Sequence, residues 1–341
     1  MKKIPVIIDC DPGHDDMVAL VMAHGSGMLD IKAVTTVAGN NTVDNTTRNA
    51  RNILHHIGAD DVPLAKGLQN PMVRGHAERL AEVARSRAKM SGAQLSTPKT
   101  QGAAVHGATG MDGYNFPENN PKQLEPIHAV EMMAKILRES DEKITIISTG
   151  PLTNVAFLIR CFPDLVDKIE QISMMGGTAD FVLIWPFMEY NTFLDPEATK
   201  IVFESGVPIT MYGYDVTYRV LYSEDTIAQL KALGNNAGDM CAALLKYFMD
   251  AHNGAIGTRL GLNGVAPVHD ACAVAGVIDP TLVTEYKMQR MEVETSGVYF
   301  DGATIPVPEG MSKLPANVKV VYNMDTPRFL DLLLKTAAAC K

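Results

Sequence analysis

The sequence predicts an α/β fold: a Rossmann-like, largely parallel β-sheet flanked by helices, in a single domain over residues 1–341. Three observations support this prediction. Short β-branched runs recur along the chain, a helical pattern follows each run after Gly or Asn, and the runs are apolar almost throughout. Strands of that kind are buried on both faces, as in a parallel sheet covered by helices. The chain shows no linker and no internal repeat.

The expected elements alternate along the chain. The expected strands are 6–8, 31–40, 143–150, 169–177 and 207–213. The expected helices are 15–24, 46–58, 128–140, 154–162 and 195–206. In the last helix, Asp195 is the expected N-cap, Pro196 the first helical residue and Gly206 the stop. Near the C-terminus we expect a short antiparallel pair between 296–307 and 317–325. The stretch 75–125 is polar, rich in Gly and without clear periodicity, which is typical of a functional loop.

The composition disfavours anionic partners and indicates a reducing compartment. The chain has 30 basic and 39 acidic residues and a net charge of −9, which disfavours nucleic acid and anionic membranes as partners. Its five cysteines are widely spaced and include no CxxC, which indicates reduced thiols in a cytoplasmic protein. The apolar run after Lys3 is too short for a signal peptide, and no apolar stretch reaches the roughly 18 residues of a membrane span.

The segment DCDPGHDD (9–16) concentrates four aspartates directly after the first expected strand. In open α/β sheets, ligands bind beyond the carboxyl ends of the strands. Other expected strands end at the same edge, with Asn40, Thr149 and Met175. Pro12-Gly13 forms a tight turn that brings the two ends of the aspartate cluster together. The sequence therefore predicts a ligand site at this edge.

The aspartate cluster points to a divalent cation. Carboxylates this close repel one another, and burying them without a partner is costly. Oxygen ligands without His or Cys spacing favour Ca²⁺ or Mg²⁺ over zinc. The alternative is that Asp15 and Asp16 only cap the following helix and Asp9 only ends a strand. From the residues alone, a metal-dependent phosphatase and a metal-dependent hydrolase both remain open.

The motif DxDPGxDD resembles the signature of the inosine–uridine type nucleoside hydrolases. Five further segments resemble later motifs of that family, in order and at suitable spacing: VTTVAGN (34–40), STGPLTN (148–154), MMGG (174–177), EYNTFLDPEA (189–198) and PVHDACAV (267–274). The resemblance implies one α/β domain, a homodimer or homotetramer, and Ca²⁺-dependent hydrolysis of ribonucleosides to ribose and free base, in nucleoside salvage.

The resemblance also implies a role for individual residues. The metal ligands would be Asp11, Asp16, the backbone carbonyl of Thr149, and Asp270. Asp11 would also be the general base on a metal-bound water that attacks directly, and Asp9 would position the loop. Asp15, Asn40 and Asn191 would bind ribose hydroxyls, and Glu189 and Met175 would lie near the 5′-hydroxymethyl group. An oxocarbenium-like transition state would be stabilised by these carboxylates.

Two histidines match positions that face the base in the family. We interpret His269 as a leaving-group or base contact, and His106, in HGATGM (106–111), as a second base contact. The alternative for each is a buried, hydrogen-bonded histidine without a role in the reaction. The other seven histidines are interpreted as helix-surface or core residues.

The sequence departs from the family pattern at two places. Around Leu183 an apolar loop, 178–188, replaces a Gly-Asn pair that helps to hold the 5′-hydroxyl, and its Trp185 is a candidate for stacking on a base. Leu260 stands near the position where many relatives carry a base-contacting tyrosine. A single tryptophan and an intact His269 favour pyrimidine or mixed base preference over strict purine preference.

Two alternatives remain beside the nucleoside hydrolase. A haloacid-dehalogenase-type metal phosphatase also carries a DxD after its first strand, but it expects a hydroxylated residue shortly after the second Asp, where this chain has Pro12-Gly13. A nucleoside- or ribose-binding protein would have kept the metal site and lost turnover.

Overall fold

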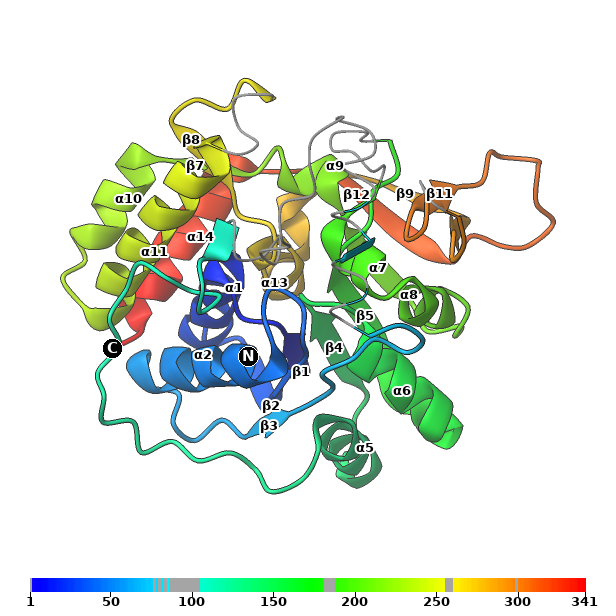
Figure 1. The fold of residues 1–341 in the computed structure, drawn as a ribbon, viewed down its shortest axis with the longest axis horizontal. Coiled ribbons are helices and arrows are strands. Elements are labelled where there is room, and N and C mark those ends of the chain that lie inside the picture. Colours follow the sequence, from blue (N-terminus) through cyan, green and yellow to red (C-terminus); the bar gives the residue numbers. More distant parts are fainter. Residues whose placement is uncertain are drawn as a thin grey trace.

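The computed structural model describes residues 2–75, 78, 81–82, 85, 105–180, 188–254, 260–297 and 300–341. Its centre is an eight-stranded sheet in the order β3-β2-β1-β4-β5-β6-β12-β9 (Figure 1). All neighbours in the sheet are parallel except β9 and β12. The strands are β1 (Ile4–Cys10), β2 (Leu29–Thr36), β3 (Leu64–Lys66), β4 (Ile144–Ser148), β5 (Ile169–Met175), β6 (Ile209–Tyr212), β9 (Val283–Gln289) and β12 (Val318–Met324). The predicted α/β class with a largely parallel sheet is confirmed.

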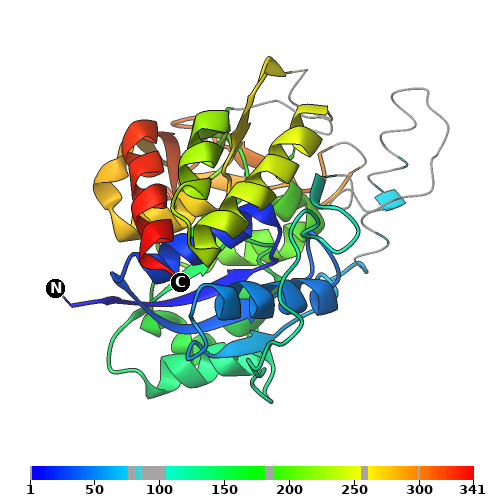
Figure 2. The same ribbon diagram turned by 90° about the vertical axis from the view of Figure 1, so that its left-hand side faces the viewer.

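Helices cover both faces of the sheet, as the edge-on view shows (Figure 2). One core packs α1 (His14–Gly25), α2 (Val43–His56), α11 (Asn236–His252), α13 (Ala271–Ile278) and α14 (Thr326–Ala339) against one face. The other core packs α5 (Ala129–Glu139), α6 (Thr153–Cys161) and α8 (Pro196–Phe203) against the opposite face. This two-sided burial explains why the central strands β1 and β4 are almost entirely apolar in sequence.

The signals predicted at the ends of α8 are confirmed. The Asp195 side chain accepts a hydrogen bond from the backbone N–H of Ala198, and Pro196 is the first helical residue. The helix ends at Phe203, and Gly206 follows with φ +80°, a conformation that favours glycine.

The antiparallel extension near the C-terminus exists, but its predicted pairing is wrong. The strand β12 pairs with β9 and β6, whereas β11 (Thr304–Pro306) pairs with β10 (Met291–Val293). The sequence interpretation missed 283–293 as strand, because β9 is an edge strand whose central residues are exposed and polar residues interrupt its apolar pattern. A further pair joins β7 (Leu221–Ser223) to β8 (Val265–Pro267).

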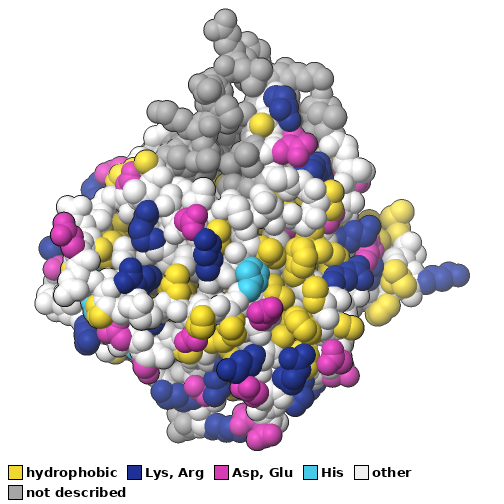
Figure 3. Space-filling model, turned by 60° about the horizontal axis from the view of Figure 1, so that its bottom comes forward, with side chains coloured by type: hydrophobic (Ala, Val, Ile, Leu, Met, Phe, Trp, Pro, Cys, Tyr) yellow, Lys and Arg dark blue, Asp and Glu magenta, His cyan; other side chains and the backbone are white. Residues whose placement is uncertain are grey.

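The remaining helical elements are short or lie at the margins. They are α7 (Tyr190–Leu194), α9 (Tyr214–Thr217), α10 (Glu224–Lys231) and the 3-10 turns η1 (Pro163–Lys168) and η3 (Pro280–Leu282). Across the described residues, no helix combines the length and apolar character needed to cross a bilayer. On the face in Figure 3, basic and acidic side chains are interspersed around a group of hydrophobic ones.

Candidate active site

The site lies where the order of the sheet reverses. After β1 the chain adds β2 and β3 on one side, and it then places β4 on the other side of β1. The carboxyl ends of β1 and β4 therefore border the crevice at which open α/β sheets bind ligands. The backbone N–H of Thr149, just after β4, donates to the carbonyl of Asp9 at 2.9 Å and ties the two ends together.

Asp9 is fully buried and holds neighbouring strands. Its Oδ1 accepts hydrogen bonds from Thr35 Oγ1 at 2.7 Å and Asn154 Nδ2 at 2.8 Å. Burial raises the pKa of this carboxyl to about 7. Asp9 thus bonds to β2 and α6 and supports the loop that follows β1, in keeping with a positioning role.

Asp11 sits in a backbone cradle. Its Oδ2 accepts a hydrogen bond from the backbone N–H of Asn40 at 2.6 Å, and its buried Oδ1 has no hydrogen-bond partner. A Cβ on Gly39 would lie 2.0 Å from Oδ2, and a Cβ on Gly150 would lie 2.7 Å from Oδ1. Two glycines therefore make room for this carboxylate. Burial and the charge of Asp16 hold its pKa well above the usual range.

Asp16 is bonded on both oxygens. Its Oδ1 accepts from Thr149 Oγ1 at 2.7 Å, and its Oδ2 accepts from the backbone N–H of Gly13 at 3.0 Å. The Nδ2 of Asn40 adds a contact to Oδ2 at 3.3 Å. Three segments that lie far apart in the sequence therefore meet at one carboxylate.

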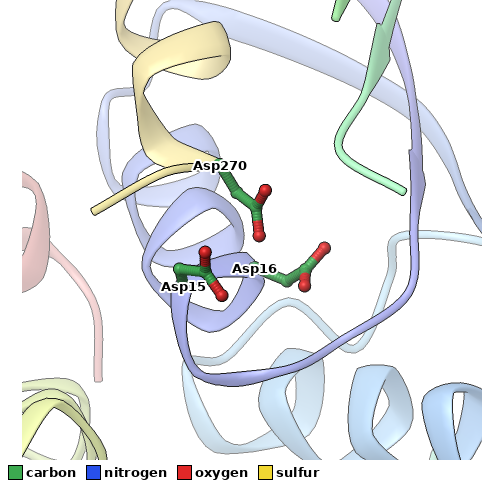
Figure 4. Close-up of side chains that lie close together, drawn as sticks. All are labelled: Asp15, Asp16 and Asp270. Atoms are coloured by element: carbon green, nitrogen blue, oxygen red, sulfur yellow. The ribbon is translucent and has the colours of Figure 1, made fainter. Parts of the chain in front are cut away.

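Asp15, Asp16 and Asp270 converge from the start of α1 and the start of α13 (Figure 4). One carboxylate oxygen of each lies within 4.8 Å of those of the other two, and all three residues are buried. Burial, followed by the charge of a neighbouring aspartate, raises the pKa of Asp15 to about 7 and that of Asp270 well above its usual range. The Oδ1 of Asp15 has no hydrogen-bond partner. A buried carboxylate group with an unsatisfied oxygen is the donor set that a hard divalent cation requires, so these residues fit a metal ion.

The structure places the predicted site residues as follows. Asp16 and Asp270, predicted as ligands, lie in the converging group, as does Asp15, which was assigned to ribose. Asp11 is not one of the three members of that group, and its Oδ2 packs against Gly39. The carbonyl of Thr149 accepts a hydrogen bond from Asn191 Nδ2 at 2.8 Å.

Glu189 and Asn191 form the start of α7. Glu189 caps this helix, since its side chain accepts from the backbone N–H groups of Asn191 at 2.9 Å and Thr192 at 3.0 Å. It also accepts from the N–H of Gly177 at 3.1 Å, which joins α7 to the end of β5. Burial raises the pKa of Glu189 to about 7. Asn191 Nδ2 also approaches the carbonyl of Met175 at 3.3 Å.

A cavity of about 670 Å³, its open mouth included, joins these residues to a set of aromatic side chains. We call the part of the lining made by Asp15, Asn40, Thr149, Glu189, Asn191 and Asp270 the carboxylate half. We call the part made by His106, Tyr214, Tyr218, Phe248, His252 and His269 the aromatic half. Val105, Met175 and Tyr190 complete the lining.

The two predicted histidines both line the aromatic half, and each uses one ring nitrogen inside the protein. His269 Nδ1 lies 2.7 Å from Thr217 Oγ1, and His106 Nδ1 lies 2.9 Å from His14 Nδ1. Burial lowers the pKa of His269 to about 3 and that of His106 well below its usual range. Both imidazoles are therefore neutral at pH 7.

The model of the inosine-uridine preferring nucleoside hydrolases matches residues 6–331 of the chain. The chain belongs to this family. It is therefore a ribonucleoside hydrolase, an enzyme that acts on N-glycosyl compounds. This membership confirms the resemblance seen in the sequence and excludes the haloacid-dehalogenase-type phosphatase.

Individual nucleoside hydrolases resemble the chain over nearly its whole length. It is 39% identical over 334 residues to the pyrimidine-specific ribonucleoside hydrolase RihA of Photobacterium profundum, with 98% of both chains covered. It is 38% identical over 336 residues to the protein of the same description from Citrobacter koseri, again with 98% of both covered. Among solved structures, a purine-preferring ribonucleoside hydrolase from Gardnerella vaginalis superposes with a TM-score of 0.83 at 28% identity, covering 98% of each chain.

Sequence reasoning missed part of the aromatic half of this nucleoside hydrolase. Tyr214 and Tyr218 follow β6 directly, so the argument from strand ends could have found them in YGYDVTY (212–218). Phe248 and His252 lie at the C-terminal end of α11, and nothing in their local sequence distinguishes them from core residues. Leu260 does not line the cavity, while Leu183 and Trp185 lie outside the described residues.

Proposed function

We propose that this nucleoside hydrolase cleaves the N-glycosidic bond of ribonucleosides with the help of Ca²⁺, and that it prefers pyrimidine bases or accepts both classes. The convergence of buried Asp15, Asp16 and Asp270 beside a cavity that is also lined by aromatic rings carries this proposal. The pyrimidine-specific description of the RihA relatives supports the base preference.

The carboxylate half is proposed to hold the metal and the ribose. Asp11, Asp16, Asp270 and the Thr149 carbonyl would hold Ca²⁺, whose oxygen preference matches this donor set. When bound, the cation lowers the pKa of a water and orients the ribose diol. The cavity is lined by the side chains of Asp15, Asn40, Asn191 and Asp270, so ribose hydroxyls can reach them. Glu189 and Met175 are proposed to lie beside the 5′-hydroxymethyl group.

Asp11 is proposed as the general base. Its Oδ1 is free of hydrogen bonds, and its Oδ2 is held by the Asn40 N–H, so one oxygen can accept a proton while the other fixes the carboxylate. The nearby carboxylates would stabilise the positive charge that develops on the sugar as the C–N bond breaks.

His269 is proposed to assist the leaving base through a hydrogen bond. Its pKa of about 3 means that it carries no charge at neutral pH. If the Thr217 hydroxyl donates to Nδ1, the ring proton resides on Nε2, the nitrogen left for the base. His106 is proposed as a second base contact on the same half of the cavity.

The first experiment measures ribose release from uridine, cytidine, inosine and adenosine, with and without a chelator, for the wild type and Asp11→Asn. We expect calcium-dependent release, fastest for the pyrimidine nucleosides, and a loss of ~10²-fold or more in the variant. Nucleoside binding by the folded, calcium-loaded protein without any release would support the binding-protein alternative instead. Release that a chelator leaves unchanged would overturn the role of the metal.

We further propose a single domain over 1–341, a cytoplasmic location, and a homodimer or homotetramer. Free thiols support a reducing compartment, since none of the five cysteines is in a disulfide and four are buried. Light scattering coupled to size exclusion distinguishes the two oligomers from a monomer.

A further inference from the structure

His252 is a buried histidine in the aromatic half that the reaction described above does not use. It is the last residue of α11, it is 2% exposed, and it lines the cavity. Its ring stacks on Phe248 with centroids 5.8 Å apart and lies 6.0 Å from the ring of Tyr218. Aromatic neighbours thus fix the plane of the imidazole without using its nitrogens.

Among the residues that the structure describes, neither ring nitrogen of His252 has a hydrogen-bond partner. In the orientation that satisfies the adjacent Asn253, its amide nitrogen donates to the carbonyls of Leu262 at 2.8 Å and Val265 at 3.1 Å. His106 and His269 differ, since each has its Nδ1 engaged within the protein. Buried polar groups are nearly always satisfied, so a buried imidazole beside a cavity points to a partner that enters the cavity.

Other rings stand between His252 and Asp270: His269 adjoins Asp270 in the chain, and the ring of Tyr218 lies 5.0 Å from that of His269 and 6.0 Å from that of His252. The charges of Glu189 and Asp15 contribute to the raised pKa values of Tyr214 and Tyr218. With the ribose at the carboxylate half, a base that extends past Tyr218 directs the edge opposite its glycosidic bond toward His252.

We propose that His252 binds the base by a hydrogen bond to the exocyclic group opposite the glycosidic bond, which in a pyrimidine is the oxygen or amine on C4. This inference rests on the proposed function, since it assumes that ribose occupies the carboxylate half. A neutral imidazole has one donor nitrogen and one acceptor nitrogen. It can donate to the C4 oxygen of uridine in one tautomer and accept from the C4 amine of cytidine in the other. One residue thereby serves both pyrimidines.

The test compares His252→Phe with the wild type on three substrates. These are uridine, cytidine and the riboside of 2-pyrimidinone, which lacks the exocyclic group on C4. Phe keeps an aromatic ring beside Phe248 and removes both ring nitrogens. We expect the variant to lose ~10-fold or more in kcat/KM on uridine and cytidine, mainly through KM, and to change by less than about 3-fold on the 2-pyrimidinone riboside. The comparison cancels differences in intrinsic leaving-group reactivity.

His56→Phe is the matched control. His56 is also buried between aromatic rings, those of Tyr114 and Phe116, but it does not line the cavity. We expect this variant to keep the wild-type ratio among the three substrates, although loss of the bond to the Tyr114 hydroxyl lowers its melting temperature.

Two further measurements keep the inference falsifiable. If His252→Phe does not fold, His252→Gln, which retains a donor and an acceptor, should keep a preference for C4-substituted bases that His252→Leu loses. Calorimetric titration with uridine and with the 2-pyrimidinone riboside measures the same preference without turnover. A wild type that binds both but releases ribose from neither would overturn the proposed function, while the binding preference still tests His252. An unchanged preference in the Phe variant would overturn the inference and leave His252 as a packing residue.

Discussion

The two halves of the cavity are built in different ways. The carboxylate half comes from the segments that follow β1, β2 and β4 and from the starts of α1, α7 and α13, and its side chains are bonded to backbone groups and to one another. The aromatic half comes from α9 just after β6, the end of α11, the segment around His106, and His269 just before α13, and its side chains mostly meet ring to ring. The first half is thus held mainly by hydrogen bonds, and the second mainly by contacts between rings.

This difference separates two kinds of effect. A change in the carboxylate half displaces groups that the sheet and its turns hold in place, so it should affect all nucleosides alike. A change in the aromatic half alters only the side chains that contact the base. It should therefore change the activity by smaller factors, and by different factors for different bases. The following predictions test that distinction, from the largest expected effect to the smallest.

Asp11→Asn should have the largest effect. The amide nearly preserves the shape of the carboxylate in its cradle but cannot act as a base, so we expect kcat to fall ~10²–10⁴-fold for every nucleoside tested. The measurement is steady-state ribose release with the protein saturated in calcium. The control is Asp44→Asn, an exposed carboxylate that pairs with Lys66, which should leave kcat unchanged. A loss confined to one base would contradict the proposed role of Asp11.

Gly39→Ala should come next. Its Cβ would lie 2.0 Å from Asp11 Oδ2, closer than any real contact, so the carboxylate must move. Misplacing a catalytic group by about 1 Å can reduce the rate ~10²-fold, and we expect a loss of this order in kcat/KM, equal for uridine and cytidine. Gly254→Ala is the matched control, because its Cβ meets nothing within 4 Å. Equal activities of the two variants would show that the cradle is not required.

Calcium should stabilise the protein in a pH-dependent way. Because Asp15 has its pKa raised from 3.8 to about 7, the metal-free folded chain holds more protons than the unfolded chain between these values. This contribution to the free energy of unfolding therefore decreases as pH rises through that window. Calcium must displace those protons, so the calcium-induced rise in melting temperature should grow from pH 5 to pH 8 and level off above. A rise that is largest at pH 5 would contradict the site. Thermal denaturation with calcium and with a chelator, at each pH, makes the measurement.

The sequence could predict the carboxylate half because its residues occupy contiguous motifs at strand ends. DCDPGHDD places Asp9, Asp11, Asp15 and Asp16 within eight residues, and the rule that parallel strands share one carboxyl edge brings Asn40 and Thr149 to them. The same rule applied to β6 would have found Tyr214. Asp270 and Asn191 were identified through the resemblance to the family rather than through that rule.

The aromatic half could not be predicted in the same way. His252 and Phe248 reach the cavity because α11 packs against α1 and ends beside it, and that packing depends on contacts between distant segments. A His–Phe pair four residues apart on an apolar helix face is indistinguishable in sequence from core. The sequence did not predict the pairing of β12 with β9 for a similar reason. Tertiary contacts, and not the local pattern, decide which strand pairs with the edge of a sheet.

Thr217→Val should have the smallest effect and the most selective one. Thr217 contacts no substrate in the proposal; it is a positioning residue whose hydroxyl lies 2.7 Å from His269 Nδ1. A hydrogen bond of this kind is worth about 1 kcal/mol, which corresponds to a loss of roughly 5-fold. If the hydroxyl donates to Nδ1 and so holds the ring proton on Nε2, the loss should appear in kcat rather than KM and be larger for the poorer leaving base. Thr217→Ser restores the hydroxyl and should restore the rate, and ¹⁵N NMR of the imidazole should show the tautomer change in the Val variant alone. Equal losses in Ser and Val would mean that Thr217 acts through packing in α9, and that the aromatic half depends on shape more than on proton placement.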